Sequence, residues 1–147
     1  MSSIIKEKKK FLFKLKLSLT IISTWWIVAF FQHILHITLR GYSLSPKNIN
    51  QIIGIFTYPF IHGDFEHLSN NSLSGFVIFS SLFLIHEKIS LKVLTIIYLF
   101  SGIILWFIGE KGSLHVGASS VIYGVAFFYF LAVLLSEKIL AWELLFL

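Results

Sequence analysis

The chain has 147 residues, of which 56% are hydrophobic and 13% are charged, and it contains no cysteine. Soluble domains usually carry about 25% charged residues, so the composition excludes a water-soluble globule, and disulfides and thiolate metal sites are excluded as well. The formal net charge of +5 is concentrated at the amino terminus. The sequence therefore indicates a single membrane domain with one basic end.

Residues 1–16 form this basic segment, in which Glu7 is the only acidic residue. Its lysines are Lys6, Lys8, Lys9, Lys10, Lys14 and Lys16. The apolar stretch that follows, at about 17–37, is long enough to span a bilayer, exceeds the core of a signal peptide and lacks a cleavage site. Because positive charge flanks membrane helices on the cytoplasmic side, we expect a retained first helix, a cytoplasmic amino terminus and no nucleic-acid partner.

Three further apolar segments are long enough to cross the bilayer, and each is expected to be helical because only helices satisfy their own backbone in lipid over so short a stretch. They lie at about 66–85, 92–108 and 116–135. A fifth apolar segment begins at about residue 139, after a polar break at 136–138, and nine residues are too few to cross. The sequence predicts an all-α polytopic membrane protein over residues 17–147, with four complete transmembrane helices and the start of a fifth.

The alternating topology places residues 38–65 and the turn at 109–114 on the outer side of the membrane. The first of these segments contains the breakers Pro46 and Pro59 and is half apolar, so we expect it to lie in the membrane interface. The second and fourth membrane helices then both start near the outer leaflet and run parallel. We expect a multi-pass protein of the cell (inner) membrane, with the lipid bilayer as its first partner.

Two polar residues stand out in the second membrane helix. His67 and Asn71 are four residues apart and share one helix face, which Gly75 continues. Polar groups inside lipid are costly and are therefore functional candidates, although such residues also serve as packing hydrogen bonds between helices.

The start of the fourth membrane helix is rich in small residues. Ser120 and Gly124 form a small-xxx-small pair that suits a tight helix crossing, and Ser119 can bond back to a carbonyl of the preceding turn. Free N–H groups at a helix start also favour a developing negative charge. Ser119, facing the amide and imidazole of a parallel helix, thus has the parts for acyl transfer: a nucleophile and oxyanion donors in a low-dielectric site.

These residues fall within two motifs. The stretch "FTYPFIHGDFEHLSNN" (56–71) contains the pattern H-x4-H-x3-N, and "GASSVIYG" (117–124) contains G-x-S with a tyrosine four residues after the serine. With both motifs in this order, the chain resembles the rhomboid family of intramembrane serine proteases over about residues 17–147. The resemblance implies a helical bundle that cleaves transmembrane substrate proteins near the outer face, without a cofactor.

The resemblance also implies roles for individual residues. Ser119 corresponds to the nucleophile, and Asn71 and His67, with the Ser119 backbone N–H, correspond to the oxyanion stabilisers. The resemblance further implies that Gly117 lets the backbone approach closely and that Tyr123 packs its ring on the catalytic imidazole. By the same resemblance, His62 orders the outer loop and its water.

The chain departs from the family pattern at three places. Ser120 replaces the last glycine of the family's G-x-S-G, and Ile53-Gly54 stand where many members carry Trp-Arg. The family takes its general base from a histidine of its sixth helix, and no histidine follows His115 here. His115 itself lies four residues before Ser119, which in a helix is one turn. We expect this chain to be truncated at its carboxyl end and to lack the base.

Two alternatives to a protease remain open. A catalytically inactive, rhomboid-like pseudoprotease that binds transmembrane helices would keep the packing glycines and would not need the base. A metal or ion carrier would use His62, His67 and His115, but the spacing of the first two suits a shared tetrahedral site poorly. We therefore predict no metal site.

Overall fold

The computed structural model describes residues 2–145, and the side chains of residues 3–136. Within that range the regular elements are all helical. The four long helices are α1 (Ser2–Ile34), α3 (Phe65–Ile85), α4 (Ser90–Ile108) and α5 (Ser119–Leu145). Each contains a stretch long and apolar enough to cross a bilayer, so the predicted all-α, multi-pass fold is confirmed.

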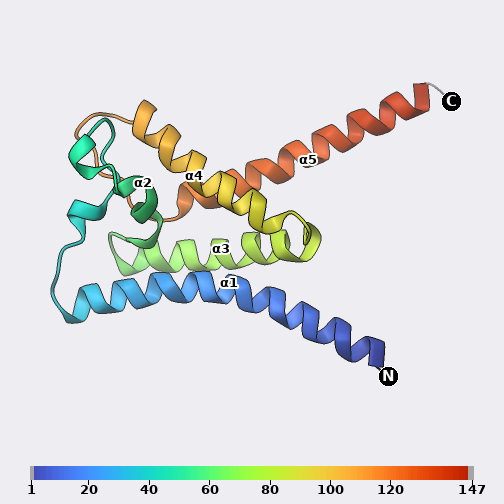
Figure 1. Ribbon diagram of the computed structural model, residues 1–147, viewed down its shortest axis with the longest axis horizontal. Helices are drawn as coiled ribbons and strands as arrows, with labels where there is room; N and C mark the ends of the chain where they lie inside the picture. Colours follow the sequence, from blue (N-terminus) through green and yellow to red (C-terminus); the bar gives the residue numbers. More distant parts are fainter. Residues whose placement is uncertain (1, 146–147) are drawn as a thin grey trace.

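The long helices alternate in direction along the chain (Figure 1). α1 packs along α3, and α5 packs against both α3 and α4. α3 and α5 begin at the same end of the bundle, where the short helices gather, and run in the same general direction (Figure 1). This is the relationship that the predicted topology requires, whereas the side of the membrane on which that end lies stays a prediction.

α1 differs from the predicted first span at both ends. It is helical from Ser2, so the basic segment continues directly into the span. It ends three residues earlier than expected, because His36 adopts a left-handed conformation with φ 50°. The N–H groups of His36 and Ile37 then donate to the carbonyls of His33 and Gln32. This Schellman arrangement closes the helix with a histidine where glycine is usual.

The outer segment folds into four short helices. They are η1 (Arg40–Tyr42), η2 (Ile49–Gln51), α2 (Gly54–Thr57) and η3 (Tyr58–Phe60). Leu44, Ile55 and Tyr58 are buried together and pack against Leu105 and Trp106 of α4. The segment is therefore a packed cap on one end of the bundle, while its predicted location in the membrane interface remains a prediction.

Gly54, one of the two residues that replace the family's Trp-Arg pair, lies where two parts of the outer segment touch. A methyl group at this position would overlap the backbone of Ser43 and Leu44. The cap therefore closes through a backbone contact that only glycine allows.

α5 contradicts two of the predicted boundaries. It begins at Ser119 and not at residue 116, and it continues without a break through residues 136–138 to Leu145. The predicted new segment from about residue 139 is therefore wrong: these residues extend α5. The polar break does not end the helix because it contains neither glycine nor proline. The Ser136 hydroxyl meets its hydrogen-bonding need within the helix by donating to the Val133 carbonyl at 2.7 Å.

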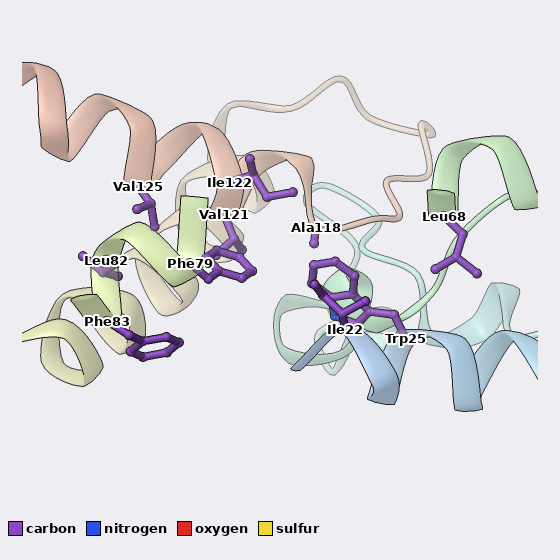
Figure 2. Close-up of a cluster of buried hydrophobic side chains, with 10 residues drawn as sticks. All are labelled: Ile22, Trp25, Leu68, Phe79, Leu82, Phe83, Ala118, Val121, Ile122 and Val125. Atoms are coloured by element: carbon purple, nitrogen blue, oxygen red, sulfur yellow. The ribbon is translucent and has the colours of Figure 1, made fainter. Parts of the chain in front are cut away.

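The main core lies between α1, α3 and α5 (Figure 2). Its buried residues are Ile22, Trp25, Leu68, Phe79, Leu82, Phe83, Ala118, Val121, Ile122 and Val125. Ala118 directly precedes α5 and faces Trp25 of α1 (Figure 2). The start of α5 is therefore held in the core and is not a free end.

Gly102 offers a test of the contact between α4 and the outer segment. Ala usually stabilises a helix interior by about 1 kcal/mol relative to Gly. Here, however, a methyl group at Gly102 would lie 2.5 Å from the Ile55 carbonyl oxygen. We expect Gly102→Ala to lower the free energy of unfolding by about 1–3 kcal/mol, measured by thermal unfolding in detergent. Gly41→Ala, whose methyl group meets nothing within 4 Å, should leave stability nearly unchanged, and equal effects of the two would contradict this view of the contact.

Candidate active site

The first turn of α3 sets the positions of His67 and Asn71. Asp64 caps the helix, and its Oδ1 accepts a hydrogen bond from the His67 N–H at 2.7 Å, as expected of an N-cap residue. His67 is thereby held at the third helical position, and Asn71 follows one turn later on the same face. Asn71 is only 5% exposed, so its amide lies inside the bundle.

The chain that leads into α5 is held by the outer segment through backbone hydrogen bonds. Leu44 and His115 form an isolated antiparallel bridge, with N–H···O distances of 3.0 and 2.8 Å. Two residues later the Gly117 N–H donates to the Tyr58 carbonyl at 2.9 Å. The approach to Ser119 is therefore fixed at two points by the cap.

Gly117 lies directly against the two polar residues of α3. A methyl group at Gly117 would lie 2.5 Å from both Cε1 and Nε2 of His67 and 2.9 Å from Nδ2 of Asn71. The residue also has φ +91°, a conformation that suits glycine. His67, Asn71 and Gly117 are thus brought together, and no larger residue than glycine fits at position 117.

Ser119 starts α5 two residues after Gly117, so their Cα atoms lie no more than about 7 Å apart. Its side chain is half-buried. The Ile122 N–H donates to the Ala118 carbonyl at 3.0 Å, which leaves the earlier N–H groups of the first turn without partners inside the helix. The positive end of the helix dipole therefore lies beside His67 and Asn71.

The amide of Asn71 has an unpaired donor. Its Nδ2 is buried and has no hydrogen-bond partner among the described residues. A buried donor without an acceptor costs about 1–3 kcal/mol, and this one points at the Gly117 backbone just before the start of α5. Such an arrangement is suited to receive an oxygen atom, above all one that carries negative charge.

His62 is buried where the outer segment meets α1 and α3. Its ring stands edge-on to His67, with centroids 5.2 Å apart, and is tilted against Trp25 at 5.6 Å. Burial, reinforced by the neighbouring His67, lowers the pKa of His62 from 6.5 to about 4, so the imidazole is neutral at neutral pH. Its proposed role in ordering the outer loop and water stays a prediction.

Other residues singled out in the sequence lie away from His67, Asn71 and Gly117. Tyr123 is 73% exposed and packs on no imidazole in the described part of the chain. His115 is not one helical turn before Ser119, as the sequence suggested, because it lies in the bridge to Leu44 and its Nε2 is 2.9 Å from the Ser113 hydroxyl. His86 packs on Phe128 and Tyr129 of α5, more than two turns beyond the start of that helix.

Tyr58 is the positioning residue that sequence reasoning missed. It is fully buried, and its hydroxyl lies 2.7 Å from the Ser120 hydroxyl and 2.9 Å from the Ser101 hydroxyl. It therefore links the cap, α4 and α5, and it gives Ser120, the residue that replaces the family's glycine, a partner. The only hint in the sequence was a tyrosine in an apolar segment, whose hydroxyl needs a partner once it is buried.

The histidines do not assemble into a metal site in the part of the chain that is described. No group of three or more His, Cys, Asp or Glu side chains there is placed to hold a metal ion. His62 and His67 make a ring contact, whereas His115 is engaged with Ser113. The carrier hypothesis thus has no geometric support.

Comparison with known families gives one match. The family model described as Rhomboid domain matches residues 49–146, about two thirds of the chain, and this range includes both motifs. No curated protein and no solved structure shows significant similarity to the chain.

The depressed pKa of His62 predicts a loss of stability in acid. Between pH 6.5 and about 4 the unfolded imidazole is protonated and the folded one is not, so the free energy of unfolding should fall as the pH falls, by up to about 3 kcal/mol. Thermal unfolding at a series of pH values measures this. His62→Gln should flatten that part of the profile, whereas His33→Gln, which removes an exposed imidazole, should not. An unchanged slope in His62→Gln would refute the assignment.

Proposed function

Because the chain belongs to the rhomboid family, we propose that it carries the nucleophile and oxyanion side of an intramembrane serine endopeptidase that cleaves transmembrane substrate proteins. Ser119 is the nucleophile, and Asn71 and His67 stabilise the oxyanion. The bond attacked lies near the end of the bundle that carries the outer segment, which we assign to the outer face. The basic end of α1 is then cytoplasmic, in keeping with the positive-inside rule.

The unpaired Nδ2 of Asn71 is the observation that carries this proposal. It lies buried beside Gly117, at the positive end of the α5 dipole. When a hydroxyl adds to a peptide carbonyl, the carbonyl oxygen becomes negative, and donors placed in advance in a water-poor site stabilise that charge by several kcal/mol. The Asn71 amide and the free N–H groups of α5 supply such donors without any rearrangement.

Activation of Ser119 requires a base within hydrogen-bonding distance, and the geometry assigns none of the chain's histidines to this role. The His67 ring lies against Gly117, and the His115 ring is hydrogen-bonded to the Ser113 hydroxyl. Ser119 lies on the same helix face as Tyr123 and Phe127, both of which are exposed. We propose that the base and the scissile peptide both approach Ser119 from this face.

A second candidate, a pseudoprotease that only binds transmembrane helices, is favoured by a different feature. An apolar cavity of about 320 Å³ lies between α1 and α4 and reaches Ala118. Its lining includes Thr20, Trp25, Phe60, Leu94 and Tyr98. A cavity of this size accepts one or two large apolar side chains from another helix, and such binding needs no activated serine.

Labelling with a fluorophosphonate separates the two candidates. We expect slow labelling of the purified chain at Ser119, accelerated by added imidazole, which replaces the missing base in solution. Ser119→Ala should abolish labelling, and Asn71→Ala should reduce its rate at least about tenfold, since one oxyanion donor contributes about 10²–10³ in related chemistry. Mass spectrometry of the labelled peptide gives the site and the rate.

Ser120→Ala is the matched control, because it removes the neighbouring hydroxyl while Tyr58 keeps Ser101 as a partner. It should label at nearly the unaltered rate. Labelling that survives Ser119→Ala would refute the nucleophile. Absence of labelling in a folded chain, with and without imidazole, would favour the helix-binding candidate.

A further inference from the structure

The end of the bundle opposite the candidate site is organised around Glu87. This residue lies in the short connection between α3 and α4, and its Oε2 is 2.9 Å from Nζ of both Lys10 and Lys14. These are the two ion pairs found among the described side chains. The two ammonium groups lower the pKa of Glu87, so the carboxylate stays ionised at neutral pH and ties α1 to the turn.

This contact defines where the membrane-spanning part of α1 begins. From Lys14 to Ile34, α1 runs for 21 residues, the same length as the whole of α3. At 1.5 Å per residue each is about 31 Å long, close to the thickness of the hydrocarbon core. Residues 2–13 therefore extend about 18 Å past that level, and Figure 1 shows them continuing beyond the α3–α4 turn and diverging from α3.

The extension lies free of the bundle and exposes both apolar and basic side chains. Its side chains from residue 3 to residue 13 are all exposed. At 100° per residue Ile4, Ile5, Phe11 and Leu12 fall within an arc of about 120°. Lys8 lies inside that arc, and Phe13 lies among Lys6, Lys9 and Lys10, so apolar and basic side chains are mixed around the helix. Exposed apolar side chains beside lysines suit the boundary between lipid headgroups and acyl chains, because a lysine stem can lie along apolar surface while its ammonium group stays among the headgroups.

Further lysines lie at the same end. Lys88 and Lys92 flank the start of α4, next to Glu87, and both are exposed. Since Glu87 neutralises part of the charge of Lys10 and Lys14, the uncompensated charge resides mainly on Lys6, Lys8, Lys9, Lys88 and Lys92. We call this group the basic end.

We propose that the basic end and the exposed apolar side chains of residues 3–13 together bind the headgroup layer of an anionic phospholipid membrane. Charge complementarity selects phosphate-rich, net negative headgroups, and the exposed isoleucine and phenylalanine side chains select a lipid surface over a soluble polyanion. Glu87 competes with the lipid for two of the lysines and so limits the strength of binding.

Native mass spectrometry of the full chain in detergent tests this, with phosphatidylglycerol and phosphatidylcholine as the lipids. We expect preferential retention of phosphatidylglycerol. The triple variant Lys6→Gln, Lys8→Gln, Lys9→Gln should weaken it by about fivefold for each lysine removed, as expected for basic residues near an anionic surface. Lys47→Gln with Lys111→Gln, at the other end of the bundle, should leave retention unchanged.

Glu87→Gln provides a test with the opposite sign. It releases Lys10 and Lys14, so retention of phosphatidylglycerol should increase several-fold, whereas Glu110→Gln, in the turn between α4 and α5, should have no effect. Equal retention of the two lipids, or weaker retention in Glu87→Gln, would overturn the proposal. So would an RNA oligonucleotide that displaces phosphatidylglycerol through the same lysines, because the partner would then be a soluble polyanion.

Discussion

The position of Ser119 depends on backbone hydrogen bonds that join the chain before α5 to the outer segment. The bridge between Leu44 and His115 and the bond from Gly117 to Tyr58 hold residues 115–117 in a non-helical path that helix packing alone would not specify. A buried backbone group left unpaired is costly, so these bonds determine where the helix can start. The candidate site is therefore a property of the cap as much as of the helices.

The cap depends in turn on α4. Tyr58 contacts Ser101 as well as Ser120, and Gly102 allows the Ile55 backbone to approach α4 closely. The contacts that lead from α4 through the outer segment to Gly117 are made by Ser101 and Gly102 of α4 and by Ile55 and the buried Tyr58 of the outer segment. A change on α4, far from Ser119 in the sequence, would therefore alter the geometry beside Asn71.

Hydropathy and alternation predicted the four membrane helices and the shared end of α3 and α5, because long apolar periodic segments have few alternatives in lipid. The same reasoning brought His67 and Asn71 towards the start of α5. It missed the role of Tyr58 because that role depends on the fold of a segment with no regular period. It misplaced the end of α5 because a serine, a glutamate and a lysine are compatible with both a loop and a helix.

Two local features were also not predicted, because each depends on the backbone geometry at a single residue. His36 occupies a left-handed position that sequence rules assign to glycine, so the end of α1 was placed three residues too late. Gly54, one of the two residues at the place of the family's Trp-Arg pair, was noted only as a departure from the family pattern, and the structure shows that it lets the backbone approach Ser43 closely. In each case the decisive fact is a dihedral angle or an approach distance, neither of which a pattern of residue types encodes.

The unbroken course of α5 has a consequence for how it sits in the bilayer. Its 27 residues extend about 40 Å, against about 30 Å of hydrocarbon. An upright α5 would therefore extend about 10 Å beyond the hydrocarbon layer, and tilting the helix would shorten that projection. Hydrophobic mismatch therefore makes the tilt of α5 sensitive to membrane thickness, and a thicker bilayer favours the upright state.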